Sequence, residues 1–430
     1  MSDLSAPIDQ PPQTAVGGPR DGSSRRSGRF WWRAHQWVGL KLSVLMSFIL
    51  FTGTLAVFAN EIDWLLNPAM RVEPATARGE IAWAKIAVNA TQALPGGQIN
   101  ELYAPIDRGF AAAAFGQAAD GRYKWVYAHP VSGEVQGVGG FMTVQRVLRY
   151  MHRHLMLPNK IGIPIVSALS ILLIISLATS FLVYKKWWRG FFRPIRFLDA
   201  RTAIGDAHRL AGLWSIWFVA LMAATGLWYL VESLGGDAPD VVWPDQAGLE
   251  WTAIDRARGV EAAITAAQTA YPALRIRSVS LASPDYGAYA VGGQDRAILV
   301  RDRANHVVIS VKSHPSHPPS SWTANTVAIH RAEQLNVHQR IGEMADLLHF
   351  GTFGGVWSKI IWFVFGALLT ALSLSGASIY GLRLVRQARQ SPTWPRFWRH
   401  LSAGMGRWKW PATGLVLLSF ILIGLAFTRF

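Results

Sequence analysis

The sequence contains no cysteine and has few acidic residues. Without Cys, the 430-residue chain can form no disulfide bond and cannot attach a haem covalently through a Cys-x-x-Cys-His motif. It also lacks the nucleotide-binding patterns Gly-x-Gly-x-x-Gly after a strand and Gly-x-x-x-x-Gly-Lys-Ser/Thr. We therefore do not expect it to take hydride from NAD(P)H through a domain of its own. No Ser/His/Asp arrangement stands out either.

Apolar residues are abundant: 51% of the chain is hydrophobic, and 20 residues are Trp. Five runs are long and apolar enough to cross a bilayer as helices. A soluble core would not need five such runs with Trp and Tyr at their ends. The sequence therefore predicts an integral membrane α-helical protein with five transmembrane helices, at roughly residues 40–59, 161–184, 211–231, 360–380 and 411–428.

The net charge of +16 comes from Lys and Arg that cluster before the first span, between spans two and three, and between spans four and five. These segments lie on one side of an alternating five-span topology. Basic residues in short loops stay in the cytoplasm, so the N-terminus is predicted to be inside and the C-terminus outside. Because membrane topology explains the charge, no nucleic-acid partner is expected.

Two apolar segments begin and end alike. "AHQWVGLKLSVLMSFILFTG" (34–53) and "AHRLAGLWSIWFVALMAATG" (207–226) both open with Ala-His and close with Thr-Gly, and both carry Gly-Leu one turn after the His. Each is followed by a polar insertion in which a helix candidate precedes several short β-like runs. The pattern predicts a two-fold internal repeat, each half carrying a small α+β domain outside, plus an extra fifth helix.

The chain resembles the PepSY-associated transmembrane family, whose best-understood members are inner-membrane ferric-siderophore reductases with b-type haem. The "HPVSGEV" turn (129–135) is similar to the family's Asp-Pro-x-Thr-Gly-x-Val but departs from it at His129 and Ser132. The matching motifs are His35-x-x-x-Gly39-Leu40 with Thr52-Gly53, "MHRHL" (151–155), His208-x-x-x-Gly212-Leu213 with Thr225-Gly226, and "LLHFGTFGG" around His349.

The resemblance implies that the protein lies in the bacterial inner membrane and carries two PepSY-like periplasmic domains. In chain order we expect a disordered cytoplasmic tail (1–29), a first span (30–59), a periplasmic domain (60–150), a second span (151–186), a cytoplasmic loop (187–205), a third span (206–232), a second periplasmic domain (233–345), a fourth span (346–384), a cytoplasmic loop (385–408) and a fifth span (409–430).

Two histidines, His35 and His208, occupy equivalent positions near the cytoplasmic face. Gly39 and Gly212 follow them at +4, on the same helix face, where a missing side chain leaves room for a flat macrocycle. Interfacial His and close helix packing through Gly are the alternative interpretations. We favour one haem iron held from two helices, because two imidazoles saturate a low-spin haem and make an electron carrier.

A second haem is expected at the outer face, held by His349 and one histidine of "MHRHL". The family's Leu-His-x-x-Leu pattern puts His152 in the ligand register. His154 lies two residues further on and faces away on a helix, although it remains the alternative ligand. The expected cofactor is therefore two non-covalent haems b, with His35, His208, His152 and His349 as iron ligands.

Haem propionates need cations nearby. Arg33, Lys41 and Arg209 are the inner candidates, and Arg153 and its neighbour Arg149 are outer ones. Lys41 lies within the first apolar run, where an unpaired ammonium costs about 2.5–3.5 kcal/mol on insertion scales; snorkelling to the lipid headgroups is the alternative interpretation.

The resemblance implies an oxidoreductase that passes electrons across the membrane to a periplasmic ferric siderophore or other Fe(III) chelate. Its electron donor would be a membrane quinol or a separate cytoplasmic reductase, and membrane lipid is its other partner. Two alternatives remain: a haem-free helper or scaffold of an iron-uptake or envelope-peptidase system, and a metal-chelate transporter.

Overall fold

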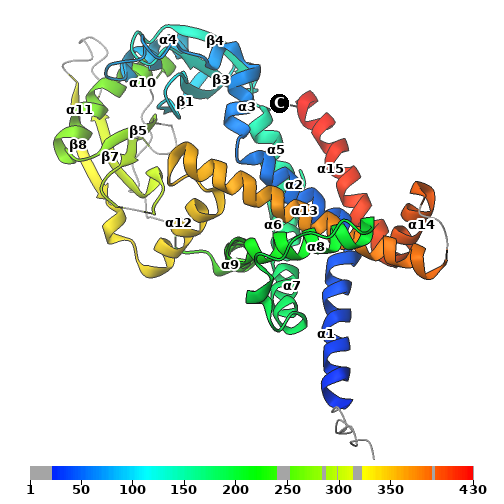
Figure 1. Cartoon of the computed structure of the whole chain (residues 1–430). Helices are drawn as coiled ribbons and strands as arrows, with labels where there is room; N and C mark the ends of the chain where they lie inside the picture. Colours follow the sequence, from blue (N-terminus) through cyan, green and yellow to red (C-terminus); the bar gives the residue numbers. More distant parts are fainter. Residues whose placement is uncertain are drawn as a thin grey trace, which may run out of the picture.

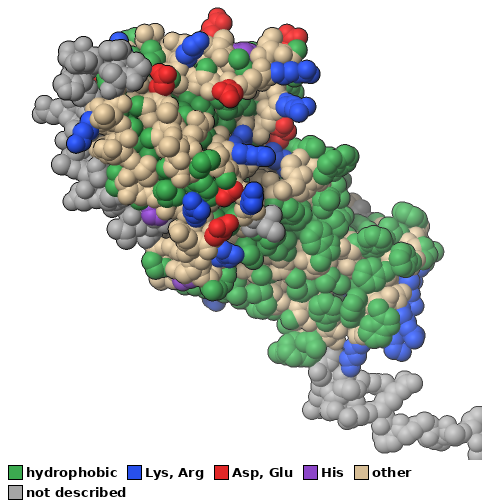
Figure 2. Space-filling view, turned by 90° about the vertical axis from the view of Figure 1, so that its left-hand side faces the viewer, with side chains coloured by type: hydrophobic (Ala, Val, Ile, Leu, Met, Phe, Trp, Pro, Cys, Tyr) green, Lys and Arg blue, Asp and Glu red, His purple; other side chains and the backbone are tan. Residues whose placement is uncertain are grey.

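The computed structural model describes residues 22–239, 252–282, 287–297, 299–312, 322–389 and 393–429. A layer of strands and short helices stands over a bundle of long helices (Figure 1). A broad zone of hydrophobic side chains covers the helical part, and Lys and Arg gather beyond its far end (Figure 2).

Within these residues four helices are long and apolar enough to cross a membrane, or five if the bent pair formed by α1 (Gly22–Lys41) and α2 (Ser43–Ala56) is one span. The two helices of this pair meet at 67°. The protein is therefore a membrane protein whose apolar runs form helices as predicted. The other candidate spans are Asn159–Val183, Ile216–Gly236, Gly355–Gln387 and Trp394–Thr428.

Three of the predicted spans are interrupted near one end. A helix α5 (Val144–His154) stops at Leu155, whose φ of 55° is left-handed, and after Pro158 the chain continues as α6 (Asn159–Ser167) and α7 (Leu169–Val183). A helix α12 (Val337–Phe350) likewise stops at Gly351, φ 66°, ahead of α13 (Gly355–Gln387). Ser215 separates α8 (Ala200–Trp214) from α9 (Ile216–Val231).

Two boundaries differ from the predicted organisation. The helix α1 begins at Gly22, so residues 22–29, predicted as part of a disordered tail, continue the first helix; the stretch contains no Pro, the residue that most strongly interrupts a helix. Residues 1–21 lie outside the described residues. The predicted loop 385–408 contains a helix α14 (Trp394–Met405), which precedes α15 (Lys409–Arg429).

The polar insertions contribute to one continuous sheet. All pairs of neighbouring strands are antiparallel, and the order is β4-β3-β2-β1-β5-β6-β7-β8. The two groups of four strands join where Leu102 pairs with Val279. The strands are β1 (Gln98–Tyr103), β2 (Ala112–Gln117), β3 (Tyr123–Ala128), β4 (Val135–Gly140), β5 (Arg275–Ser280), β6 (Tyr289–Gln294), β7 (Asn305–Lys312) and β8 (Thr323–His330).

Three helices cover one face of this sheet: α4 (Trp83–Gln92), α10 (Ala253–Arg258) and α11 (Val260–Ala270) (Figure 1). They share a single apolar core with the strands. Side chains alternate between the two faces of a strand, so the neighbours of buried Val279 and Val307 point the other way. On that opposite face the sheet carries polar residues and borders a cavity. A short helix α3 (Ala59–Leu66) links α2 to the sheet.

Candidate functional site

The predicted inner histidines lie side by side. The ring centres of His35 on α1 and His208 on α8 are 6.5 Å apart. His35 Nδ1 lies 3.2 Å from Ser176 O and 3.0 Å from Thr179 Oγ1, both on α7. His208 Nδ1 lies 2.8 Å from Ser375 Oγ on α13. Each ring is therefore oriented by a helix that comes later in the chain.

The predicted outer histidines form a second pair. The ring centres of His152 on α5 and His349 on α12 are 6.0 Å apart. His152 Nδ1 donates to Ile49 O on α2 at 2.8 Å, and His349 Nδ1 lies 2.8 Å from Thr225 Oγ1 on α9. Both histidines lie just before a helix interruption, and both border the same cavity.

One tautomer satisfies the hydrogen bonds of all four rings. The carbonyls of Ser176 and Ile49 can only accept, so Nδ1 of His35 and His152 carries the proton. Thr225 and Ser375 already donate their hydroxyls to backbone carbonyls, so they accept from the other two rings. Nε2 of each ring thus keeps its lone pair, the arrangement found in histidines that bind a metal while their other nitrogen donates to the protein.

The spacing within each pair suits one metal ion between two imidazoles. Metal–imidazole bonds of about 2.0–2.1 Å place the centres of two rings on opposite sides of one ion roughly 6 Å apart. Among the described residues no group of three or more His, Asp or Glu could hold a metal ion by itself. Two protein ligands per site are what a macrocycle supplying the other four requires, so the residues present fit haem b.

The Thr-Gly ends of the two repeated segments support the outer pair, a role that sequence reasoning missed. A Cβ at Gly53 would lie 2.5 Å from Cε1 of His152, so only glycine lets that ring approach α2. In the other segment Thr225 holds His349. Because Thr-Gly closes both segments, its repetition was the signal that could have pointed to these contacts.

The glycines at +4 from the inner histidines are not needed for helix packing. A Cβ at Gly39 would meet no atom within 4 Å, and one at Gly212 would be in ordinary contact with Leu372 at 3.6 Å. Close approach of a neighbouring helix therefore does not explain either glycine, and the accommodation of a flat group beside them stays a prediction.

The inner cations have varied surroundings. Lys41 Nζ donates to Gly404 O, near the end of α14, at 2.7 Å, so its ammonium is satisfied by a helix C-terminus. Arg209 pairs with buried Asp206 at 3.2 Å, and Arg33 is exposed. Lys41 and Arg209 therefore have partners within the protein, and Arg33 is the exposed residue of the three.

The outer cations lie together beside His152. Arg149 and Arg153, on the same helix α5, both border the cavity. Burial, and then the charge of Arg153, lowers the pKa of Arg149. Two guanidinium groups one helical turn apart at the cavity wall suit the anionic edge of a propionate-bearing ligand. His154 instead packs against Tyr150 on its own helix, with ring centres 4.8 Å apart, and it does not border the cavity.

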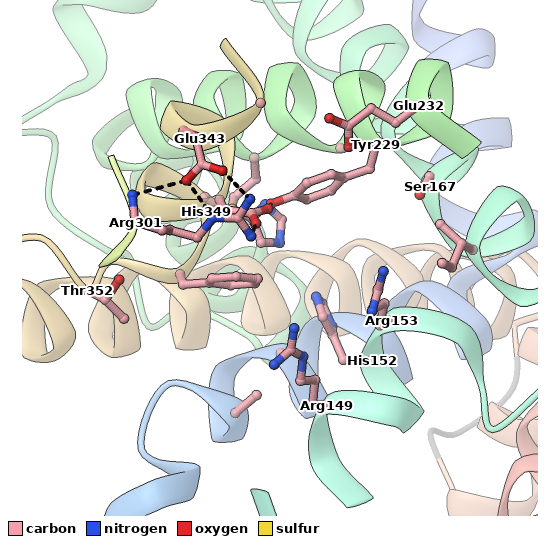
Figure 3. Close-up of a pocket in the computed structure, with 18 of the residues that line it drawn as sticks. Arg149, His152, Arg153, Ser167, Tyr229, Glu232, Arg301, Glu343, His349 and Thr352 are labelled. Carbon is pink, nitrogen blue, oxygen red and sulfur yellow. Dashed lines mark hydrogen bonds and ion pairs between the residues drawn. The ribbon is translucent and has the colours of Figure 1, made fainter. Parts of the chain in front are cut away.

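The cavity has a volume of about 1580 Å³. Its membrane end lies between helices and is lined by apolar side chains such as Ile49, Leu169 and Leu369. Its other end reaches the sheet, where polar side chains line it. In the close-up, Arg149 and Arg153 lie across the cavity from Tyr229 and Glu343 (Figure 3).

A network of ion pairs at the sheet end was not predicted. Arg301 binds both oxygens of Glu343 on α12, at 2.9 and 2.8 Å, and also pairs with Asp346. Tyr229 of α9 donates to Asp346 at 2.7 Å. Burial raises the pKa of Glu343, and the charge of Arg303 opposes this shift. The network ties the sheet to the helix that carries His349.

The fold and these contacts define a helical membrane protein with two partly buried histidine pairs and a cavity beneath an extramembrane sheet. A family model described as the PepSY-associated TM region matches residues 32–383. The chain therefore belongs to the PepSY-associated transmembrane family, which confirms the resemblance found in the sequence. No curated protein sequence matches it.

Proposed function

We propose that this protein is a di-haem b oxidoreductase of the bacterial inner membrane that passes electrons outward to a ferric siderophore or related Fe(III) chelate in the periplasm, releasing iron as Fe(II). The electron donor would be a quinol or a separate cytoplasmic reductase. One electron suffices, because Fe(III) binds hard oxygen-rich chelates far better than Fe(II).

The observation that carries this proposal is the presence of two histidine pairs with the same chemistry. Each pair joins one histidine from each repeated half, and all four turn Nδ1 to a hydrogen-bond partner in the protein. Haem bound between such imidazoles supplies a low-spin, one-electron Fe(III)/Fe(II) couple. The outer pair borders a cavity that could admit a chelate.

The residues around each pair have distinct roles in this proposal. Thr179 and Ser375 fix the rings of the inner pair, and Thr225 and Ile49 O fix those of the outer pair. Because these partners lie on other helices, the ring orientations are set before a cofactor binds, which favours tight binding. Arg149 and Arg153 would neutralise propionates at the outer site.

The proposal includes a two-fold internal repeat and two PepSY-like modules on the periplasmic side. Corresponding contacts support the repeat: His35 is held by α7 and His208 by α13, while His152 is held by α2 and His349 by α9. Lys and Arg beyond the far end of the hydrophobic zone (Figure 2) support a cytoplasmic location for that end.

The first test is spectroscopic. Protein purified from haem-replete cells should contain about two haems b per chain, both low-spin. Replacing His35 or His208 with Ala should remove one haem, and replacing His152 or His349 should remove the other. His154→Ala is the matched control on α5 and should retain both. Protein without haem would support the haem-free helper instead.

The second test addresses activity. Dithionite-reduced protein should be reoxidised by a ferric siderophore, with Fe(II) trapped by a chelator such as ferrozine. His349→Ala should lose this reoxidation even while its inner haem remains reducible, because electrons would have no exit near the cavity. Indifference of the wild type to every ferric chelate, or undiminished reduction by His349→Ala, would refute the proposed activity.

A further inference from the structure

The helix α12 carries two acidic side chains close to His349. Asp346 precedes the histidine by three residues and Glu343 precedes Asp346 by three, and residues three apart are neighbours on a helix surface. All three border the cavity. The side chains of Glu343 and Asp346 are only 10% and 16% exposed, so water screens their charges in part. The carboxylate of Asp346 is therefore held one turn from a predicted iron ligand.

Tyr229 connects Asp346 to this histidine from the neighbouring helix α9. Its hydroxyl donates to Asp346 at 2.7 Å, and its ring meets the ring of His349 edge-on, with the ring centres 5.2 Å apart. Tyr229 lies one turn after Thr225, which is the partner of Nδ1 of the same histidine. Because one helix contacts both the imidazole and the carboxylate, their relative position is fixed.

The positive charge opposite these carboxylates comes from the sheet. Arg301, in the segment between β6 and β7, binds both oxygens of Glu343 (Figure 3) and pairs with Asp346. Arg303 also reaches Glu343, through Nε, but its side chain is 68% exposed, so water screens much of its charge. The side chain of Arg301 is 25% exposed. Within the described part of the chain, Arg301 is therefore the cation that compensates Asp346.

A charge held beside a redox centre changes its reduction potential. A negative charge stabilises Fe(III) over Fe(II) and lowers the potential, whereas a positive charge raises it. At an effective dielectric constant near 20, a unit charge about 10 Å away changes such an equilibrium about tenfold. Groups beyond the ligands tune metal sites in this way.

We propose that Asp346 and Arg301 set the reduction potential of the haem at the outer pair: the carboxylate lowers this potential, and the guanidinium offsets the effect. The inference rests on the proposed function and adds how its exit site is tuned. Neither residue is an expected iron ligand, and both act through their charge. The sheet thereby contributes, through Arg301, to a site whose histidines lie on helices.

The test is a redox titration of the full-length protein with haem bound, followed by haem absorption at pH 8, where ordinary carboxylates are ionised. The wild type should show two one-electron components, and the component missing from His349→Ala belongs to the outer haem. Asp346→Asn removes the charge and keeps the shape of the side chain. It should raise the outer potential, lowering the Fe(III)/Fe(II) ratio at a fixed potential about tenfold, or about 59 mV for one electron. Arg301→Gln should lower the outer potential by a similar amount.

Three comparisons separate an effect of charge from an effect on structure. The double variant Arg301→Gln/Asp346→Asn removes both charges and should return toward the wild-type potential, which a disordered site would not do. The inner haem should keep its potential in every variant. Asp120→Asn is the matched control, because this exposed carboxylate pairs with Arg122 and does not border the cavity; both of its potentials should equal those of the wild type.

Shifts of the outer potential in the same direction for both single variants would overturn the inference, as would an Asp346→Asn protein that titrates like Asp120→Asn. If Arg301→Gln does not fold with haem, the sign of the Asp346→Asn shift still decides.

Failure of this inference is distinct from failure of the proposed function, because the titration contains no ferric chelate. A protein whose potentials shift as expected but which reduces no ferric chelate would retain the tuning pair and lose the reductase assignment. A protein with unshifted potentials that reduces ferric chelates would do the reverse, and one without haem would refute both.

Discussion

Replacing Gly53 with Ala should disturb the outer histidine pair selectively. The added Cβ would lie 2.5 Å from Cε1 and 2.6 Å from Nδ1 of His152, so the ring must move. It would then stretch its hydrogen bond to Ile49 O, now 2.8 Å long. Overpacking costs about 1–3 kcal/mol and the hydrogen bond about 0.5–1.5 kcal/mol. Alanine returns about 0.8–1.0 kcal/mol of helix propensity, so the net destabilisation is roughly 0.5–3.5 kcal/mol.

Two measurements check this prediction: thermal unfolding in detergent and haem content by the pyridine haemochrome method. Gly53→Ala should unfold at lower temperature and lose the outer haem while retaining the inner one. Gly424→Ala on α15 is the control, because its Cβ would meet no atom within 4 Å and it should unfold no earlier than the wild type. If Gly53→Ala unfolded like Gly424→Ala and kept both haems, the ring would not be confined as described.

Three further predictions concern other parts of the protein. Thr225→Val removes the acceptor for His349 Nδ1 and should weaken outer haem binding about 10–100-fold, measured by haem titration, whereas Thr225→Ser should stay near wild type. Burial and the charge of His330 lower the pKa of His306 from 6.5 to about 4. The folded state thus binds the proton less tightly than the unfolded state, and His306 contributes stability above about pH 6.5 that is lost as the pH falls toward 4, by up to roughly 3 kcal/mol; thermal unfolding across this range should show the loss, and His306→Asn should reduce it. Reporter fusions after Val138 and Gly236 should be exported and one after Arg193 retained inside; export of the Arg193 fusion would invert the proposed topology.

The helices were predicted from local apolar runs, the inner histidine pair from the internal repeat, and the outer pair from the family resemblance. A long apolar run by itself indicates a helix that crosses the lipid bilayer. The repeated His-x-x-x-Gly motif placed His35 and His208 in equivalent positions. The structure brings those two together, and it brings His152 rather than His154 to His349. Whether these pairs hold haem stays a prediction.

Features that depend on pairing between distant segments were not predicted. The pairing of β1 with β5, which joins the two groups of strands into one sheet, cannot be recognised from the sequence of either strand. A strand shows the same alternation of side chains at the edge of a sheet and in its middle. The position of Lys41 against Gly404 depends on how α14 returns along the bundle. The Arg301–Glu343 pair joins a loop before β7 to α12, and neither residue lies in a repeated motif.

The junction between β1 and β5 has a consequence for how the protein is made. While the chain is being synthesised, strands β1 to β4 are complete before α6, α7, α8 and α9 follow. Until β5 emerges, the edge of β1 around Leu102 presents unpaired backbone N–H and C=O groups, to which another chain can attach. Nascent or truncated chains that end before Arg275 would therefore be prone to association through this edge, and membrane insertion of the intervening helices sets how long it stays uncovered.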